Sequence, residues 1–450
     1  MLNKKIIPLL LILLIGMFLI AGCNIQLADD SSAENQNGEE NQEETNVSDQ
    51  DPEGTGSDDP ENSEEAEEVE EVEEFFEITI SAVGDVMVHN NQLIAQYDAE
   101  KDVYDFRNNF QYLKPYLDQS DVNMANLETT FAGPERGYSS FPMFNTPDAL
   151  GEALGNAGFQ FISTINNHTY DTGEQGFYRT LDILEEQGLT PLGTRSDESE
   201  PRYVIEEVEN IKVGMTAYTY ETEKMGEEIS LNGIRIPSHM EPLMNTFHDH
   251  YQEEDIREME EIINAMKDDG ADIIVFFLHW GNEYHREPST FQTQLANKLS
   301  SLGVDVIFGS HPHVVQPMDI IENDGHETLV VYSMGNLISN QREETLRNYT
   351  ANAQYTEDGL MVHATFQKSS LTEEVERISV EYTPLWVHRY SDGSGFGYEV
   401  LPVAETINNF EAFNIQSDDL KNRIKRSLER TEEMVLQNND TFILNDGTFE

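Results

Sequence analysis

The chain has 450 residues, of which 86 are Asp or Glu and 26 are Lys or Arg, so its formal net charge at pH 7 is −60. Because a nucleic-acid binder needs a cationic surface to displace counterions, this charge argues against DNA or RNA as a partner. The single cysteine excludes an intramolecular disulfide and a cysteine-rich zinc module.

The amino terminus, residues 1–23, is predicted to be a lipoprotein signal peptide. Two lysines precede an apolar run from Ile6 to Gly22, and Leu19-Ile20-Ala21-Gly22-Cys23 has the pattern of a bacterial lipobox. Lipidation of Cys23 would hold the protein on the extracytoplasmic face of the cell membrane. The alternative is an uncleaved anchor, because 17 apolar residues are near the lower limit for spanning a bilayer.

Residues 24–76 are predicted to be a disordered acidic tether. The segment is rich in Glu, Asp, Asn, Ser and Gln, contains no Lys or Arg, and has almost no apolar residues to bury. Repulsion between its carboxylates should keep it extended, as a spacer between the membrane and a folded domain. A calcium-collecting or partner-binding acidic tail is the alternative.

From residue 78 onward, short apolar runs alternate with helix-like segments, which predicts an α/β fold. The predicted strands are 75–83, 121–126, 158–164, 212–218, 272–279, 304–309 and 328–333. The predicted helices are 110–118, 147–157, 181–187, 253–268, 290–302 and 417–437. Alternation at 360–367 and 377–384 predicts a carboxy-terminal hairpin. We expect one domain over 78–340 and an extension, 341–450, that packs on it.

Polar residues stand at or just after the ends of five of these apolar runs. They are Asp85, then Asn126 with Glu128, then Asn166, Asn167 and His168, then His279, and finally His311 with His313. Ligands of α/β sheets bind outside the carboxyl ends of the strands, so these side chains are expected to share one site. Nitrogen and oxygen donors of this kind suit a divalent ion such as zinc, manganese or iron.

Six short motifs carry a resemblance to a known family. They are Gly84-Asp85-Val86-Met87, Ala125-Asn126-Leu127-Glu128, Asn166-Asn167-His168-Thr169-Tyr170-Asp171-Thr172-Gly173, His279-Trp280-Gly281-Asn282-Glu283-Tyr284, Gly309-Ser310-His311-Pro312-His313-Val314-Val315-Gln316 and Tyr332-Ser333-Met334-Gly335-Asn336-Leu337. In this order they resemble the CapA family of poly-γ-glutamate capsule synthesis proteins, whose domain is similar to calcineurin-like metallophosphoesterases. The resemblance implies a four-layer sandwich of two mixed β-sheets flanked by helices.

The resemblance also implies roles for individual residues. It makes His168 the residue that protonates a leaving group, and the metal ligands would be Asp85, Glu128, Asn167, His279, His311 and His313. One or two divalent metal ions would clamp a phosphate and activate a water. The chain departs from the phosphoesterase pattern at Met87, which stands in place of a histidine, and at Glu128, which is longer than the usual bridging carboxylate. A thioether is a poor ligand for a hard metal, so Met87 weakens one of the two metal positions.

Four further residues are candidates for the same site. Asp171 is expected either to orient His168 or to cap the following helix. Asn126, Glu283 and Asn336 are candidates for substrate contacts; a surface loop is the alternative for Glu283, and a structural turn is the alternative for Asn336.

Two functions from different classes are compatible with these features. One is a membrane-anchored accessory protein of poly-γ-glutamate synthesis or export, in which the cleft recognises that polymer or another cell-surface polymer, or organises membrane synthase subunits. The other is a cell-surface metal-dependent hydrolase of a phosphoester or an amide-linked polymer. A lipoprotein that only binds a ligand is a third possibility. So acidic a protein should repel polyglutamate unless cations, salt or a local basic patch intervenes.

Overall fold

The computed structural model describes residues 72–226, 228–248, 250–391, 393 and 395–448. The predicted signal peptide, including Cys23, and almost all of the predicted tether lie outside the described residues. Within the described part, no helix is long and apolar enough to cross a membrane. The first strand begins at Phe75, so the last two residues of the predicted tether, 75 and 76, belong to it.

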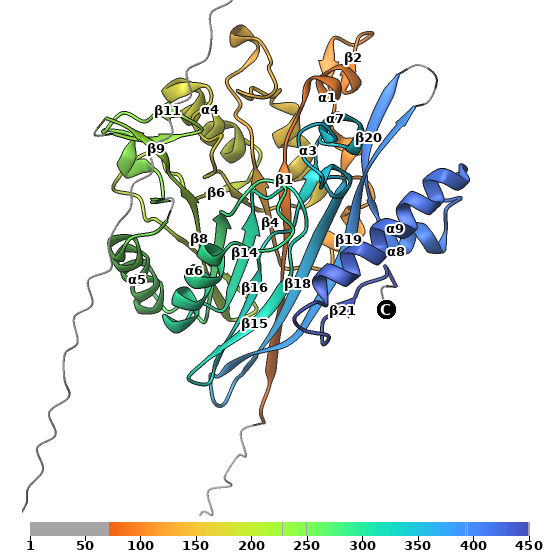
Figure 1. Ribbon diagram of the computed structural model, residues 1–450. Helices are drawn as coiled ribbons and strands as arrows, with labels where there is room; N and C mark the ends of the chain where they lie inside the picture. Colours follow the sequence, from red (N-terminus) through yellow and green to blue (C-terminus); the bar gives the residue numbers. More distant parts are fainter. Residues whose placement is uncertain (1–71, 227, 249, 392, 394, 449–450) are drawn as a thin grey trace, which may run out of the picture. The chain divides into compact units, whose positions relative to one another are not determined.

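The fold has two large mixed β-sheets with helices on their outer faces (Figure 1), as the sequence predicts. In spatial order the first sheet contains β20 (Phe396–Pro402), β19 (Val375–Ser391), β18 (Asp358–Ser369), β1 (Phe75–Val86), β4 (Val122–Leu127), β5 (Phe161–Ser163) and β6 (Thr190–Leu192), with β17 (Asn336–Ile338) beside β1 and β21 (Ile443–Leu444) beside β19. The second sheet contains β12 (Thr246–Phe247), β8 (Ile211–Tyr220), β13 (Ile273–His279), β14 (Val306–Ser310), β16 (His326–Val331) and β15 (Met318–Asn323), with β7 (Val204–Val208) beside β8.

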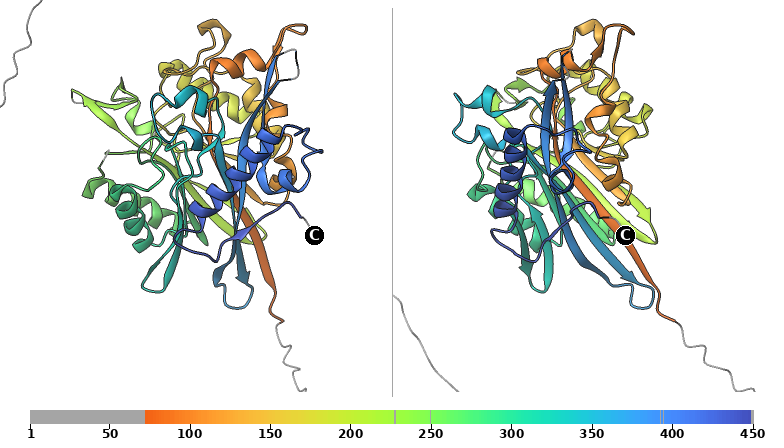
Figure 2. Two further views of the ribbon diagram at one scale, coloured as in Figure 1. Left: turned by 45° about the vertical axis from the view of Figure 1, so that its right-hand side comes forward. Right: turned by 90° about the vertical axis from the view of Figure 1, so that its right-hand side faces the viewer.

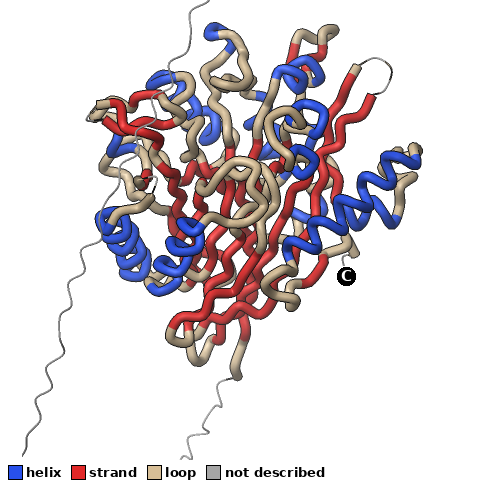
Figure 3. The backbone as a smooth tube through the Cα atoms, viewed as in Figure 1, coloured by secondary structure: helices blue, strands red, loops and turns tan. Residues whose placement is uncertain are grey.

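Two small sheets stand apart from these layers. They are β9 (Thr222–Met225), β10 (Glu228–Leu231) and β11 (Ile234–Arg235), and the pair β2 (Tyr97–Asp98) and β3 (Val103–Tyr104). The helices are α1 (Asn90–Ala95), α2 (Lys114–Leu117), α3 (Ala149–Ala157), α4 (Gly173–Glu186), α5 (Glu253–Asp268), α6 (Thr290–Ser301), α7 (Glu343–Leu346), α8 (Val403–Asn408) and α9 (Asp418–Val435). Figure 3 shows the strands in the middle of the described body, with helices around them.

The main core lies between the two large sheets, because alternate residues of their strands face each other there. Ile80 and Val122 of the first sheet belong to one buried cluster with Val213 and Phe277 of the second. A second cluster covers the outer face of the first sheet under α2 and α3, and a third joins the second sheet to α5 and α6. The layers are visible from the side in Figure 2.

The carboxy-terminal segment completes the first sheet. The predicted hairpin is present as the antiparallel pair β18 and β19, and β18 also pairs antiparallel with β1 along most of its length. Helix α9 lies against β19, and its first turn is capped by Ser417. The inner face of α9 is tied to the sheet by Arg430, which forms an ion pair with the buried carboxylate of Asp358 at the start of β18.

A close backbone approach brings β1 beside the loop before β17. Gly84 lies against Gly335, and a Cβ atom at Gly84 would be only 1.9 Å from the Gly335 carbonyl oxygen. Because glycine has no side chain, β1 continues through residue 84 and ends at Val86 instead of at the predicted Val83. Asp85 is therefore paired within the sheet, opposite Asn336 of β17 and Asn126 of β4.

Candidate metal centre

The polar residues that follow the predicted strands meet at one edge of the two large sheets. Asp85 and Glu128 come from the ends of β1 and β4 in the first sheet, and His279 and His311 come from the ends of β13 and β14 in the second. All four side chains are buried. The centre therefore spans both sheets, as the strand-end argument predicts.

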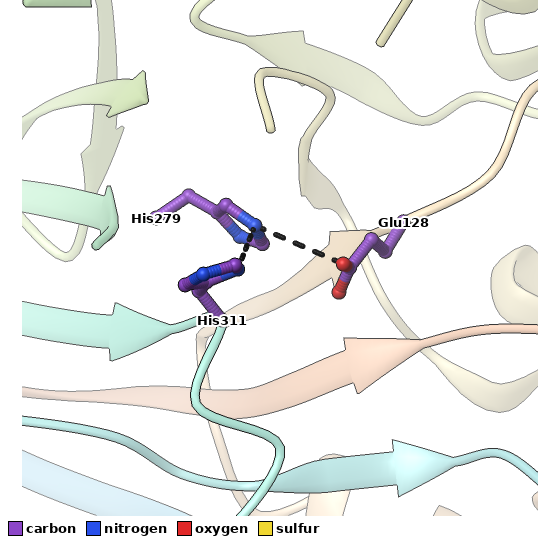
Figure 4. Close-up of side chains that lie close together, drawn as sticks. All are labelled: Glu128, His279 and His311. Carbon is purple, nitrogen blue, oxygen red and sulfur yellow. Dashed lines mark hydrogen bonds and ion pairs between the residues drawn. The ribbon is translucent and has the colours of Figure 1, made fainter. Parts of the chain in front are cut away.

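Two groups of side chains have the composition and spacing of a divalent metal site. Glu128, His279 and His311 each offer one ligand atom, and these atoms lie within 4.8 Å of one another. The same holds for Asp85, Glu128 and His313. Figure 4 shows Glu128, His279 and His311 pointing toward one another, with dashed lines that join His279 to each of the other two. Glu128 belongs to both groups, as a bridging carboxylate would.

The carboxylate of Glu128 has no hydrogen-bond partner among the described residues. Both of its oxygen atoms are buried and accept no hydrogen bond, and Oε1 lies within ion-pair distance of His279 Nε2 at 3.8 Å and His313 Nε2 at 3.7 Å. Burial raises the pKa of Glu128 well above its usual value, and the negative charge of Asp85 raises it further, whereas His313 lowers it. A buried carboxylate without partners is costly, and a cation would satisfy it, so the donor set fits a metal ion.

Hydrogen bonds hold the ligand side chains in place. Asp85 Oδ1 accepts from Asn126 Nδ2 at 2.8 Å, and Asp85 Oδ2 lies 2.9 Å from His313 Nδ1. His279 Nε2 lies 2.8 Å from Asn167 Oδ1 and 3.0 Å from His311 Nδ1. These contacts leave His313 Nε2 directed toward Glu128, on the opposite side of the ring from Asp85.

The three imidazoles of the centre differ in their charge. Burial lowers the pKa of His279 well below 6.5, and the pKa of His311 falls for the same reason, which keeps both rings neutral and able to bind a metal. Burial also disfavours the charged form of His313, but the carboxylates of Glu128 and Asp85 outweigh it and raise its pKa to about 10. Without a metal ion, His313 is therefore the internal cation of the site.

Backbone strain accompanies the two histidines of the His311-Pro312-His313 motif. His311 has φ +97° and His313 has φ +57°, a left-handed region that non-glycine residues seldom adopt. The strain is offset by contacts that this conformation permits, since the His311 N–H donates to Asp85 Oδ2 at 3.3 Å. Hence the loop directs both imidazoles into the centre.

His168 and Asp171 form a second unit beside these ligands. His168 Nδ1 lies 2.7 Å from Asp171 Oδ2, and both side chains are buried. Asp171 also accepts the Phe144 N–H at 2.6 Å and does not cap α4, whose N-cap residue is Thr172. Of the two roles predicted for Asp171, its contacts favour orienting His168. An imidazole held in this way has its other nitrogen, Nε2, available for a proton.

The candidates for substrate contacts occupy different environments. Asn126 and Asn336 are fully buried; Asn126 bonds to Asp85, and the Asn336 amide donates to the Thr356 carbonyl at 3.0 Å. These contacts account for both asparagines as supports of the loops. Glu283 is exposed in the loop after β13, yet its charge helps to raise the pKa of Glu128 and of His313.

Three residues of the site have no counterpart in the sequence predictions. Tyr220, the last residue of β8, places its hydroxyl 3.3 Å from His311 Nε2. Asn232, in the turn between β10 and β11, donates from Nδ2 to Asp171 Oδ1 at 3.3 Å and to the Pro142 carbonyl at 3.1 Å. His89 packs edge-on against Phe144, with the ring centroids 5.4 Å apart.

Burial, together with the charges of His313 and His168, lowers the pKa of His89 to about 4. Its position four residues after Asp85 was the available signal in the sequence. The contacts of Tyr220 and Asn232 depend on chain segments far from the motifs, so local sequence patterns do not reveal them.

Comparison with known proteins relates this site to a family. The sequence model described as "Bacterial capsule synthesis protein PGA_cap" matches residues 79–341, more than half of the chain. The capsule biosynthesis protein CapA of Bacillus anthracis is 25% identical over 281 residues, which cover 59% of this chain and 60% of that protein. The PGA biosynthesis protein CapA of Bacillus subtilis is 26% identical over 272 residues, which cover 59% of this chain and 64% of that protein.

The chain thus matches less than two thirds of the length of these curated relatives. Among solved structures, a phosphatase of Mycoplasma pneumoniae aligns with a TM-score of 0.40 and 15% sequence identity, covering 68% of this chain and 93% of that one. The matched residues 79–341 contain every residue of the two candidate metal groups. The chain belongs to the family of bacterial capsule synthesis proteins described as PGA_cap.

Proposed function

We propose that this protein is a lipid-anchored, extracytoplasmic component of capsule polymer synthesis or export, and that it acts through a divalent metal centre. The names of its relatives, which concern capsule and PGA biosynthesis, support the biological role. The observation that carries the metal centre is Glu128, a buried carboxylate with two unpaired oxygens shared by two groups of ligands.

In this proposal the metal is held by Asp85, Glu128, Asn167, His279, His311 and His313. A bound divalent cation supplies Lewis acidity toward a phosphoryl or carbonyl oxygen and lowers the pKa of a water molecule. Zinc, manganese and iron all suit this mixture of nitrogen and oxygen donors. Whether one or two ions bind depends on Met87, which offers no ligand that a hard metal prefers.

The protein's own groups have separate tasks in the proposed chemistry. His313, paired with Asp85, must release its proton before Nε2 can bind a metal, so metal binding is coupled to proton release. Asp171 keeps the Nδ1 proton of His168 in place, and His168 Nε2 can then hand a proton to a leaving group. Asn232 donates a hydrogen bond to the other oxygen of Asp171, Oδ1, and so helps to hold this carboxylate in place.

The His168–Asp171 pair is the specific observation that favours a second function, hydrolysis of a phosphoester or an amide-linked polymer. A protein that only recognised or exported a polymer would have no need of an oriented proton donor beside the metal. Turnover therefore separates the two functions, whereas metal binding is common to both.

The test compares His313→Ala with His168→Ala in the full-length protein, with metal content measured on protein purified without chelator. Protein with His313→Ala should lose its bound metal, and cells that carry this variant should lose capsule polymer. His168→Ala should keep the metal and, if the protein is a hydrolase, lose about 10²–10⁴-fold of its turnover. His388→Ala is a matched control, because His388 is also buried and paired with a carboxylate, Glu399, but belongs to neither metal group.

Equal metal content in the wild type and His313→Ala, at equal protein concentration, would rule out the proposed centre. Normal polymer production by His168→Ala, with loss of production when residues 78–340 are deleted, would assign the protein to export or scaffolding. The lipid anchor is tested separately, because lipidation depends on the Cys23 thiol. Cys23→Ala should leave the membrane fraction or accumulate as an unprocessed precursor, and unchanged processing and fractionation would favour an uncleaved anchor.

A further inference from the structure

A cavity of about 590 Å³ lies where α1, β2 and the hairpin of β19 and β20 meet. Its walls include Ile94 of α1, Gln96 at the end of that helix, Tyr97 of β2 and Phe396 of β20. The labels of α1, β2 and β20 stand close together at the upper right of Figure 1. None of the described residues that line this cavity is a candidate metal ligand, so the cavity is separate from the metal centre.

Three large apolar side chains of the cavity are exposed to solvent. The exposed fractions are 75% for Ile94, 41% for Tyr97 and 57% for Phe396. The ring of Tyr390 adds to them, because it lies across Gly397 of the neighbouring strand, where a Cβ atom would be 2.1 Å from its Cζ atom. Exposed apolar side chains that gather in one hollow are typical of a place where a ligand or a partner docks.

The polar wall of the cavity is held in place by hydrogen bonds. Gln96 is only 5% exposed, and its Nε2 donates to the Asp105 carbonyl at 2.7 Å and to Asn108 Oδ1 at 2.6 Å. Asn108 Nδ2 in turn donates to the Tyr398 carbonyl at 3.0 Å, which ties this wall to β20. Gln96 Oε1, by contrast, accepts a hydrogen bond from none of the described residues. A largely buried acceptor without a donor favours a ligand that brings an N–H or O–H group.

The carboxylates of the cavity are paired with neighbouring cations. Asp98 forms an ion pair with Lys101 at 2.7 Å, and Asp105 forms one with Arg107 at 2.6 Å. These two aspartates are the acidic members of the described lining, which contains no Lys or Arg. An anion would be repelled by a protein with a net charge of −60, and a cation would compete with Lys101 and Arg107 for the carboxylates. The cavity therefore suits a neutral ligand.

We propose that this cavity binds a neutral glycan that contains N-acetylated amino sugars. The rings of Tyr97 and Phe396 offer flat apolar surfaces for the C–H faces of the sugar rings. An acetamido group supplies an N–H for Gln96 Oε1 and a carbonyl to which the Asn91 amide can donate, and its methyl group can contact Ile94. The site goes beyond the proposed function, because it would hold the protein on a glycan whatever the metal centre does.

The test is isothermal titration calorimetry of the full-length protein with chitotetraose, a neutral β-1,4-linked tetramer of N-acetylglucosamine. Cellotetraose, which has the same linkage and length but no acetamido groups, is the second probe. The cavity variant is Tyr97→Ala with Phe396→Ala. The matched control is Tyr349→Ala with Phe75→Ala, which removes the same two residue types at exposed positions outside the cavity.

The wild type should bind chitotetraose about tenfold more tightly than cellotetraose, and the cavity variant should bind chitotetraose about tenfold more weakly than the wild type. The control should stay within about twofold of the wild type. Because the probe is neutral, its dissociation constant should change little as salt rises. Absence of binding to the wild type, equal affinity for the two probes, or equal dissociation constants in the two double variants would each overturn the proposal.

A milder variant separates loss of the site from misfolding. Asn91→Ala removes only an exposed amide from α1 and favours the helix, so it should weaken chitotetraose binding about three- to tenfold and leave cellotetraose binding unchanged. All variants leave the candidate metal ligands intact, so their metal content and the midpoint of urea unfolding should match the wild type. A second copy of this chain is the competing occupant of the apolar side chains. Self-association in sedimentation that the cavity variant abolishes, without glycan binding, would overturn the proposal.

Discussion

Glu128→Gln provides a decisive test of the metal centre, because this carboxylate belongs to both groups of candidate ligands. The substitution keeps the size of the side chain but removes its charge and one of its ligand oxygens. If a cation binds between these residues, a single change weakens both positions. If no cation binds, the change removes a buried acid that accepts no hydrogen bond and whose charged neighbour is His313, 3.7 Å away.

The expected magnitudes follow from the surroundings of Glu128. Its two oxygens are buried without partners and its pKa is raised, so at pH 7 the metal-free protein bears the cost of an unsatisfied acid. Such a group costs about 1–3 kcal/mol, and Glu128→Gln should recover at most the part that comes from its charge, because the buried amide also lacks hydrogen-bond partners. In the wild type, metal at a hundred times its dissociation constant should add about 2.7 kcal/mol, an increment that the variant should lose.

The assay is urea unfolding followed by tryptophan fluorescence, in chelated buffer and with excess manganese or zinc. Glu399→Gln is the control, because Glu399 is also a buried carboxylate but is paired with His388 at 2.9 Å and lies in neither ligand group. It should lower the stability of the metal-free protein and leave the metal increment unchanged. The reasoning about Glu128 would be refuted if Glu128→Gln were less stable than the wild type without metal and kept the full metal increment.

Three other predictions concern His363 of β18, Asn232 beside the site and Arg430 of the carboxy-terminal helix. Burial lowers the pKa of His363 to about 4, so the unfolded chain binds a proton at this residue more readily than the folded chain does. The contribution of neutral His363 to the free energy of unfolding, about 3 kcal/mol, should be complete above pH 6.5 and should disappear as the pH falls to about 4. Unfolding free energies of the wild type and His363→Gln between pH 7.5 and 4 measure this, and parallel curves would contradict it. Asn232→Gly keeps the left-handed turn at φ +50° but removes the amide, so it should reduce any turnover about tenfold or more at unchanged metal content; unchanged turnover would exclude a positioning role. Arg430→Ala leaves the buried carboxylate of Asp358 without its ion-pair partner, so it should lower the free energy of unfolding in urea by about 3–5 kcal/mol. Arg426→Ala, at an exposed position of the same helix, should lower it by less than about 0.5 kcal/mol. Similar losses in the two variants would contradict this prediction.

The elements that the sequence predicts well are those with strong local patterns. Helix α5 has the predicted bounds Glu253–Asp268, because its charged and apolar residues alternate with the helical period. The strands before His279 and His311 are also predicted to within two residues at each end, since their uninterrupted apolar runs are typical of strands buried on both faces.

Elements that depend on partners elsewhere in the chain are predicted less well. Helix α4 is expected at 181–187 but starts at Gly173, and it includes Gly176, a residue of low helix propensity that lies close to Thr172 and Ala132. The helix expected at 110–118 is only the short α2, Lys114–Leu117, preceded by a turn of 3₁₀-helix at Arg107–Asn109. Strand β20 is missing from the prediction, since it is stabilised by pairing with β19.

For the site, the sequence by itself determined which residue types stand at the strand ends, and hence that nitrogen and oxygen ligands would gather at one edge of the sheets. Only the tertiary structure decided how they are used. It leaves Glu128 without a partner, pairs His313 with Asp85, and brings Asn232 and Tyr220 to the centre from other parts of the chain. The physical reason is that strand periodicity is a local property, whereas burial, charge pairing and contacts between distant segments arise only when the two sheets pack together.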